Sequence, residues 1–351
     1  MTRTSLKWLF SGICILFAAC AVCPAFGQTT PEPAAAQALE TKTELVKLDV
    51  TVLDDKGNFV DGLKQDDFRV FDNGVERPII FFAPVTAAAK VVVVLETSPA
   101  VYLFRNEHLA AAYALVNGLG VDDEVALVTY SDTPREVVPF TTNKAELLNA
   151  LGNVQYMMGS AALNLYYTVS DVVHGLSQYP GKKAIVLLTT GLDSSPPAQW
   201  QELTERLRGS DVLIFSVGLL GPLSNAKTVK QKHSKKMSKA EAFDSENLAG
   251  APTLEKAEQA LHSLSSMTGG RAYFPDSGAA FAPAYRQIAA CLRHEYVVGV
   301  APEHDGAFHQ LSVQIAGQEG TAPGKKSHKK KKGKQPEYSL SFREGYVAPG
   351  P

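Results

Sequence analysis

The apolar and polar positions change their period twice along the chain. From Glu44 apolar residues alternate with polar ones, which is the period of a half-buried strand. The pattern then becomes continuous apolar runs separated by helical spacing, and the alternation returns near the C-terminus. We therefore expect β-rich segments at 44–85 and 294–347 on either side of an α/β region at 88–293.

The middle region alternates apolar runs with helical stretches. Val91 to Leu95 is a run rich in β-branched residues, typical of a central strand buried on both faces. Further strands are expected at 124–130, 137–140, 184–188, 212–217 and 271–274. Helices are expected between them, at 109–116, 144–152, 164–178, 199–208, 254–267 and 279–293. Strands that alternate with helices predict a doubly wound, mostly parallel sheet covered on both faces.

The two flanking segments are predicted to be strands joined by turns. Asn73-Gly74, between apolar runs at 68–71 and 79–82, is the strongest short signal for a β-hairpin. At the other end, strands are expected at 296–300, 311–315 and 338–342. We expect these strands to pack with residues 44–83, so that the α/β region is inserted into a β unit.

The first residues have the three-part pattern of a secretory signal peptide. Arg3 and Lys7 precede an apolar run at 8–22, and Ala25-Phe26-Gly27 is an acceptable cleavage site. This predicts a signal peptide at 1–27, a flexible Pro-, Ala- and Thr-rich tether at 28–43, and an exported protein that is periplasmic, secreted or envelope-associated. No transmembrane span is expected after cleavage. Two alternatives remain open: a retained N-terminal anchor, and a lipoprotein modified at Cys20.

Charge and cysteine content narrow the classes of partner. The formal charge is −2, so the chain has no global attraction to nucleic acid or to an anionic membrane. Cleavage after Gly27 would leave Cys291 as the one cysteine, so no internal disulfide is expected.

Lysine-rich segments at 226–240 and 320–336 lack apolar periodicity and are predicted to be solvated loops. Alternatively, they bind an anionic envelope surface; no aromatic residues interleave with the lysines, which argues against nucleic-acid binding.

The standard catalytic patterns are absent from the sequence. It contains no G-x-S-x-G, H-E-x-x-H, G-x-x-x-x-G-K-[ST] or G-x-G-x-x-G motif. His304, between Glu303 and Asp305 on a turn, is interpreted as a solvated polar residue of that turn. The alternative is an acid–base cluster formed by the three residues. Cys291 lies on an apolar helical stretch and is expected to be a buried structural thiol. We predict that the protein is not an enzyme; the rival hypothesis is a hydrolase with a non-standard site formed by Glu96, His304 or other scattered groups.

Ligands of open α/β sheets bind beyond the carboxyl ends of the strands. Three segments at such positions, 96–100, 159–163 and 189–193, together resemble the metal-site loops of the von Willebrand factor type A family. The resemblance covers about residues 88–292, and the order of strands and helices agrees with it. The segment from Asp66 to Gly74 and the closing Arg343-Glu344-Gly345-Tyr346 resemble those of related proteins of acidobacteria.

The resemblance implies a metal site built from D-x-S-x-S, a Thr and an Asp, with the oxygen ligands that suit Mg²⁺. In this sequence several of the positions differ. Glu96 stands at the first Asp, Ser98 matches the first Ser, and Ala100 replaces the second. Ala161 falls at the Thr, with Ser160 one residue earlier, and Thr190 replaces the third-loop Asp. We therefore expect no cofactor and no metal, except for a weakly held divalent ion bound through waters.

The same face is the candidate binding surface for an unidentified protein partner, because domains of this family typically act as adhesion or assembly modules. Its candidate residues are Glu96, Ser98, Ser160, Thr190 and Asp193. An alternative role for two of them is purely local, since Ser98 and Asp193 precede Pro-containing helix starts. A second alternative for the whole protein is a structural envelope component that makes its contacts through the lysine-rich loops.

Overall fold

The computed structural model describes residues 45–102, 105–157, 162–219, 221, 251–316 and 338–351. Six expectations lie outside these residues: the signal peptide at 1–27, the tether at 28–43, Ser160, Ala161, and the lysine-rich segments at 226–240 and 320–336. No helix of the described residues is long and apolar enough to cross a membrane.

A six-stranded sheet forms the centre of the α/β part, in the order β10-β9-β8-β5-β6-β7. Its strands are β5 (Lys90–Glu96), β6 (Glu124–Tyr130), β7 (Pro134–Thr141), β8 (Lys183–Thr189), β9 (Val212–Gly218) and β10 (Ala272–Tyr273). Neighbouring strands are parallel except for β7, which pairs with β6 in the antiparallel direction at the edge. The predicted doubly wound, mostly parallel fold is confirmed.

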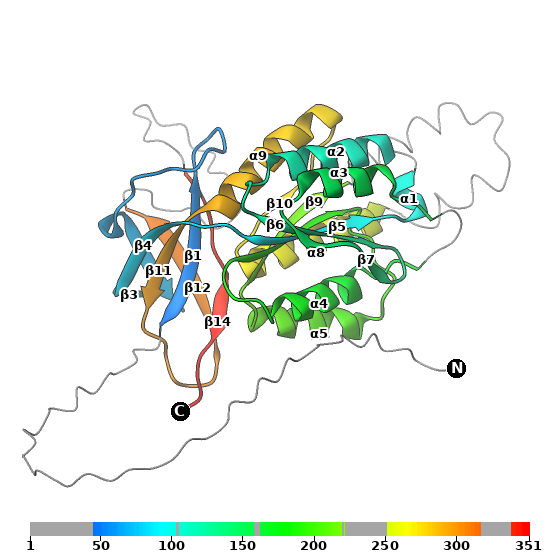
Figure 1. Cartoon of the computed structure of the whole chain (residues 1–351). Helices are drawn as coiled ribbons and strands as arrows, with labels where there is room; N and C mark the ends of the chain where they lie inside the picture. Colours follow the sequence, from blue (N-terminus) through cyan, green and yellow to red (C-terminus); the bar gives the residue numbers. More distant parts are fainter. Residues whose placement is uncertain (1–44, 103–104, 158–161, 220, 222–250, 317–337) are drawn as a thin grey trace, which may run out of the picture. The chain divides into compact units, whose positions relative to one another are not determined.

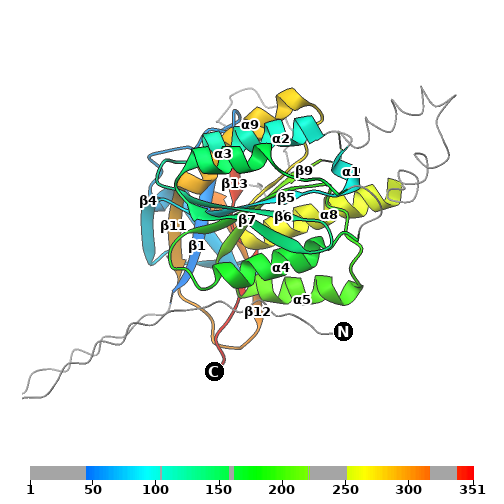
Figure 2. The same ribbon diagram turned by 45° about the vertical axis from the view of Figure 1, so that its right-hand side comes forward.

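Helices cover both faces of this sheet (Figure 1). On one face lie α1 (Pro99–Tyr102), α2 (Arg105–Gly118), α3 (Lys144–Gly152) and α9 (Gly278–Arg293). On the other lie α4 (Leu165–Leu176), α5 (Pro197–Arg208) and α8 (Ala251–Thr268), and the turned view in Figure 2 separates the two layers. Successive side chains of a strand point to opposite faces, so Val93 joins the core under the first layer and Val94 the core under the second.

The flanking strands form two four-stranded antiparallel sheets around a core of their own. One sheet contains β1 (Val46–Leu53), β4 (Phe81–Thr86), β11 (His294–Val300) and β13 (Ser339–Ser341). The other contains β2 (Phe68–Asp72), β3 (Val75–Arg77), β12 (Phe308–Ile315) and β14 (Gly345–Val347), and a short 3-10 helix, η1 (Gln65–Asp67), precedes β2. N-terminal strands pair with C-terminal ones in both sheets, β1 with β11 and β2 with β12. The expected packing of the two flanking segments is therefore present, and the α/β part lies between β4 and β11 in the chain.

The predicted hairpin forms, but its second strand is shorter than expected. Asn73 and Gly74 both have positive φ (48° and 82°), as a two-residue hairpin turn of the primed type requires. The partner strand ends at Arg77, because Pro78 has no N–H group to donate to the ladder. The apolar residues after Pro78 instead lead into β4, which pairs with β11 in the other sheet.

The β sandwich contacts the α/β part at the amino ends of the parallel strands. Arg271, just before β10, donates to Ser341 Oγ of β13 from Nη2 at 2.9 Å. Lys182, just before β8, forms an ion pair with Glu295 of β11 at 2.5 Å. The carboxyl ends of the parallel strands therefore lie at the opposite edge of the sheet, where the candidate site is found.

Candidate functional site

The direction of strand addition reverses at β5. This first strand of the sheet has β6 on one side and β8 on the other, so the chain leaves β5 and β8 at the switch point of the sheet, where ligands of open α/β sheets bind. Glu96 is the last residue of β5, and Thr189 is the last residue of β8. The topology alone therefore brings the first and third candidate loops together.

The Glu96 carboxylate is fully buried and is surrounded by hydrogen-bond donors. Its Oε2 accepts from the Thr190 backbone N–H at 2.6 Å, from Thr190 Oγ1 at 2.9 Å and from Thr189 Oγ1 at 2.8 Å. Its Oε1 accepts from Ser98 Oγ at 2.5 Å. Glu has one more methylene than the Asp that the resemblance places here, and this length lets the carboxylate reach from β5 to the end of β8.

Tyr130, at the end of β6, extends the network on the other side of β5. Its hydroxyl lies 2.6 Å from Thr189 Oγ1 and 3.4 Å from Glu96 Oε2. Burial and the Glu96 carboxylate raise the pKa of Tyr130 well above its usual value, so the phenol keeps its proton. The Gly191 N–H donates to Thr189 Oγ1 at 2.9 Å. Through Glu96 itself, Tyr130 and Thr189, the ends of β5, β6 and β8 are all bonded to one buried carboxylate.

Asp193 and Ala100 lie outside the Glu96 network. Asp193 does not join the Glu96 network through a direct hydrogen bond: it accepts from the Tyr166 N–H at 3.0 Å and from the Ser195 N–H at 2.7 Å. It therefore satisfies the first turn of α4, whereas the sequence suggested the entry of the following helix. Ala100 is buried in α1. Ser98, Glu96 and Thr190 are brought together.

A buried histidine that was not predicted lies near these strand ends. His108 of α2 has its Nδ1 3.0 Å from the hydroxyl of Tyr156, and burial lowers its pKa to about 4. Its helical spacing to the apolar Ala111, Ala112 and Leu115 was the available signal, because a polar residue on an apolar helix face is buried with that face. Met157, which follows Tyr156 in the chain, donates its backbone N–H to Thr97 O at 2.8 Å and is 46% exposed.

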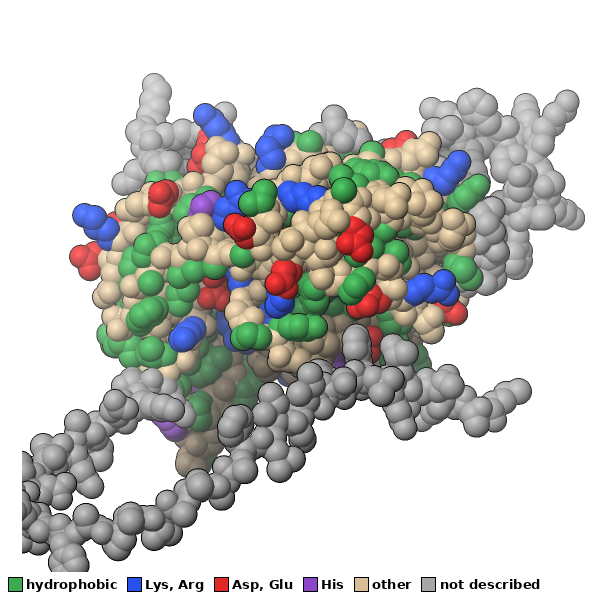
Figure 3. All heavy atoms as spheres, viewed as in Figure 1, with side chains coloured by type: hydrophobic (Ala, Val, Ile, Leu, Met, Phe, Trp, Pro, Cys, Tyr) green, Lys and Arg blue, Asp and Glu red, His purple; other side chains and the backbone are tan. Residues whose placement is uncertain are grey.

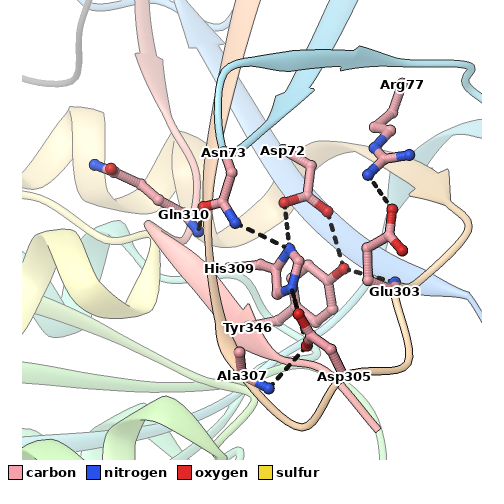
Figure 4. Close-up of polar contacts among 9 residues, drawn as sticks. All are labelled: Asp72, Asn73, Arg77, Glu303, Asp305, Ala307, His309, Gln310 and Tyr346. Carbon is pink, nitrogen blue, oxygen red and sulfur yellow. Dashed lines mark hydrogen bonds and ion pairs between the residues drawn. The ribbon is translucent and has the colours of Figure 1, made fainter. Parts of the chain in front are cut away.

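A second polar cluster lies in the β sandwich, around His309 rather than His304 (Figure 4). His309 Nδ1 lies 2.6 Å from Asp72 Oδ1, and its Nε2 lies 3.2 Å from both oxygens of Asp305. Tyr346 donates to Asp72 Oδ2 at 3.0 Å. These bonds to carboxylates, that of Asp72 first, raise the pKa of His309.

In the alternative acid–base cluster of Glu303, His304 and Asp305, both acids have partners outside the three residues. Asp305 pairs with His309, and Glu303 pairs with Arg77. The strand alternation carried the signal, since His309 shares the inward face of β12 with Leu311 and Val313. Cys291 is buried, as expected for a structural thiol, and burial raises its pKa to about 11.

These observations define an α/β domain with a buried polar network at the switch point of β5. The von Willebrand factor type A domain family matches residues 90–274, more than half of the chain. The protein therefore belongs to this family, which confirms the resemblance drawn from the loops. No curated protein matches the chain.

Solved structures with a similar fold include a von Willebrand factor type A protein from Catenulispora acidiphila, with 14% identity over 74% of this chain and 72% of that one, and a TM-score of 0.44. An aerotolerance-related membrane protein from Bacteroides fragilis shares 14% identity over 57% of this chain and 98% of its own, with a TM-score of 0.40. BatB from Bacteroides thetaiotaomicron shares 15% identity over 58% and 98%, with a TM-score of 0.41.

Proposed function

We propose that this protein is an exported, non-enzymatic interaction module that binds a protein partner without a divalent ion. The binding surface is the side of the sheet at the carboxyl ends of its parallel strands, around Glu96, here called the Glu96 edge. Membership of the von Willebrand factor type A family supports the interaction role, because domains of this family are generally interaction modules. The N-terminal pattern of Arg3, Lys7 and the apolar run supports export.

The metal-independent part of this proposal depends on the Glu96 carboxylate, which is buried and surrounded by hydrogen-bond donors. A Mg²⁺ site needs oxygen lone pairs directed at the ion in octahedral geometry. Here the two Glu96 carboxylate oxygens accept hydrogen bonds from Ser98, Thr189 and Thr190, so the lone pairs that an ion would need are already engaged within the protein. Ala100 has no side-chain oxygen. The described residues therefore do not fit the ligand set that the family's metal site requires.

The geometry gives no support to the hydrolase alternative. Glu96 lies at the carboxyl end of β5, whereas the neighbour of His304, Glu303, is bonded to Tyr346 in the β sandwich at the opposite edge. The seven residues of β5 alone separate these edges by roughly 20 Å at about 3.3 Å per residue. The two residues proposed for that chemistry therefore do not share a pocket.

The structural-component alternative depends on the lysine-rich segments, which lie outside the described residues. On the face drawn in Figure 3, acidic and basic side chains of the described residues are interspersed rather than gathered by sign. Deleting both lysine-rich segments tests this alternative. We expect the deleted chain to remain in the cell envelope fraction, whereas its loss from that fraction would favour the lysine contacts.

Calorimetric titration of the protein with Mg²⁺, Mn²⁺ or Ca²⁺ tests the metal-independent site. We expect no saturable heat at micromolar concentrations. A variant that rebuilds the family's motif (E96D, A100S, A161T and T190D) serves as the positive control and should gain Mg²⁺ binding. Saturable binding by the unmodified chain that disappears in Glu96→Ala would overturn the proposal.

Capture of envelope proteins on the immobilised protein tests the binding face. The same partner should be retained in EDTA and in Mg²⁺, and Met157→Lys should release it because a charge replaces an exposed apolar contact. Val121→Lys is the matched control, since Val121 is 77% exposed and precedes β6 at the other edge of the sheet. Retention by Met157→Lys, or release by EDTA, would contradict the proposed mode of binding.

A further inference from the structure

A buried histidine connects the C-terminal residues to the β sandwich (Figure 4). His309 of β12 has a carboxylate at each ring nitrogen: Asp72 Oδ1 lies 2.6 Å from Nδ1, and both oxygens of Asp305 lie 3.2 Å from Nε2. The ring also packs against that of Tyr346 of β14, with the two centroids 5.3 Å apart. We call Asp72, Asp305, His309 and Tyr346 the His309 cluster.

Tyr346 connects this cluster to the turn at 303–307, which precedes β12. Its hydroxyl donates to Asp72 Oδ2 and accepts from the Glu303 N–H, both at 3.0 Å. Asp72 ends β2, and Tyr346 lies in a strand that pairs with β12 over only three residues. The C-terminal strand therefore depends on these side-chain bonds as well as on its short ladder.

The same turn and the C-terminal residues are also joined through their backbones. The Ala348 N–H donates to the Ala307 carbonyl at 2.8 Å, and the Gly306 N–H donates to the Pro349 carbonyl at 3.1 Å. Within the turn, Asp305 Oδ1 accepts from the Ala307 N–H at 2.8 Å. A change at Asp305 therefore reaches the end of the chain through this turn.

The two bonds of the ring require a doubly protonated His309. A ring nitrogen and a carboxylate oxygen both carry lone pairs, so each approach needs a proton on the nitrogen. Asn73 Nδ2 lies 3.3 Å from Nδ1, farther away than Asp72, and a protonated Nδ1 cannot accept from it. The imidazolium is positively charged, and its bonds to the carboxylates, that of Asp72 first, raise the pKa of His309.

A neutral His309 has one N–H and can donate to only one of the two carboxylates. The Asp72 side chain is fully buried, whereas 55% of the Asp305 side chain is exposed. A buried carboxylate without a donor costs more free energy than an exposed one, because water hydrates the exposed one. The remaining proton therefore stays on Nδ1 beside Asp72, and the bond to Asp305 is lost.

Other ionisable groups lie on the elements around His309: Tyr346 of β14, Glu303 and His304 of the turn, and Arg77 of β3. Burial raises the pKa of Tyr346, so its phenol stays protonated where a histidine titrates. Glu303 pairs with Arg77. Histidine is the side chain whose charge changes near neutral pH, and of the two histidines here His304 is exposed whereas His309 is buried.

We propose that the His309 cluster is a pH-sensitive switch for the C-terminal segment. Protonated His309 holds the turn at 303–307 and the residues 345–351 against β2. Loss of the proton releases Asp305, and the turn and the segment then detach together. Detachment opens the β14 side of β12 at 308–310, because β14 is its partner there. The switch lies in the β sandwich and does not depend on the partner binding proposed for the Glu96 edge.

Hydrogen–deuterium exchange of the full chain at about pH 6 and about pH 9 measures this detachment, after correction for the intrinsic exchange rate. Protection of the amides in 303–310 and 345–351 should fall between these two values, about tenfold for each unit by which the pKa of His309 exceeds the ordinary one. An NMR titration of the His309 ring gives that pKa in the same protein. The peptide that covers 91–95 of β5 is the internal reference and should keep its protection.

Asp305→Asn and His304→Gln test the assignment to His309. Asn keeps an oxygen for the Ala307 N–H but offers His309 no charge, so Asp305→Asn should lower the protection of both segments already at about pH 6 and reduce its dependence on pH. His304→Gln is the matched variant, which removes the other histidine of the turn and should keep the full dependence. Equal protection of both segments at the two pH values in the unmodified chain would overturn the proposal, as would an unchanged profile in Asp305→Asn or a lost one in His304→Gln.

Discussion

At the scale of single residues, buried polar groups decide which sites of this protein are available. The Glu96 carboxylate is hydrogen-bonded to Ser98, Thr189 and Thr190, whereas the Glu295 carboxylate is ion-paired with Lys182. Both ring nitrogens of His309 are bonded to carboxylates, those of Asp72 and Asp305. A buried polar group therefore indicates a function only when its partners have been counted.

Glu96→Ala should destabilise the fold strongly. The substitution leaves the donors of Thr189, Thr190 and Ser98 buried without their acceptor, which costs about 3 kcal/mol or more in unfolding free energy. Urea denaturation measures this loss. Glu107→Ala, at an exposed position of α2, should stay within about 0.5 kcal/mol of the unmodified chain. A similar effect of the two substitutions would show that the Glu96 network contributes nothing particular to stability.

Stability should also depend on the charge of His309. The Asp72 and Asp305 carboxylates and the Tyr346 hydroxyl surround it, and the carboxylates raise its pKa above the ordinary 6.5. The protonated form is therefore favoured by folding, so the contribution is complete below about pH 6.5 and is lost as the pH rises through the higher folded pKa. The unfolding free energy should fall over that interval.

Denaturant unfolding at a series of pH values measures this effect in matched variants. His309→Gln should remove the fall, whereas His174→Gln should keep it, because His174 is exposed on α4. An unchanged pH profile in His309→Gln would assign the dependence to other groups.

At the scale of elements, chain breaks determine which strands pair. The β2–β3 hairpin depends on the positive φ of Asn73 and Gly74, and Pro78 ends it and lets the chain cross to the other sheet. Hydrophobic alternation alone did not distinguish a continuing hairpin from a crossing strand. The difference is one missing N–H group.

Gly74→Ala should cost about 1–2 kcal/mol, because an L-residue is strained at positive φ. A Cβ at this position meets nothing within 4 Å, so the loss would be conformational rather than steric. Gly118→Ala is the matched control: this glycine ends α2, has equally open space and lacks positive φ, so the substitution should be neutral or stabilise by up to about 1 kcal/mol. Thermal unfolding should show a lower midpoint for Gly74→Ala and an unchanged or higher midpoint for Gly118→Ala. Equal shifts of the two midpoints would contradict the turn assignment.

At the scale of the whole molecule, the α/β part is held between strands of the sandwich. The chain enters it from β4 and leaves it directly into β11, and Arg271, Lys182 and Arg343 connect the two parts. We expect both parts to unfold in one transition. In a Trp8→Phe chain, Trp200 of α5 is the sole tryptophan and reports the α/β part by fluorescence, while circular dichroism reports all sheets. Separate midpoints would show that the parts unfold independently.

The sequence by itself determined the fold class, because hydrophobic periodicity is set by local strand and helix geometry. Continuous apolar runs such as Val91–Leu95 identified the buried strands, and the loops after β5 and β8 identified the family. The sequence also marked Glu96 and Thr190 as departures from the metal motif, since these are differences in residue type.

The tertiary structure alone decided what those departures produce. Only the order of strands shows that Glu96 meets Thr189 and Thr190, that Asp193 bonds the start of α4, and that Asp72 meets His309. The physical reason is that hydrogen bonds and burial depend on neighbours in space, and these contacts join residues up to 237 positions apart, beyond the reach of any local pattern.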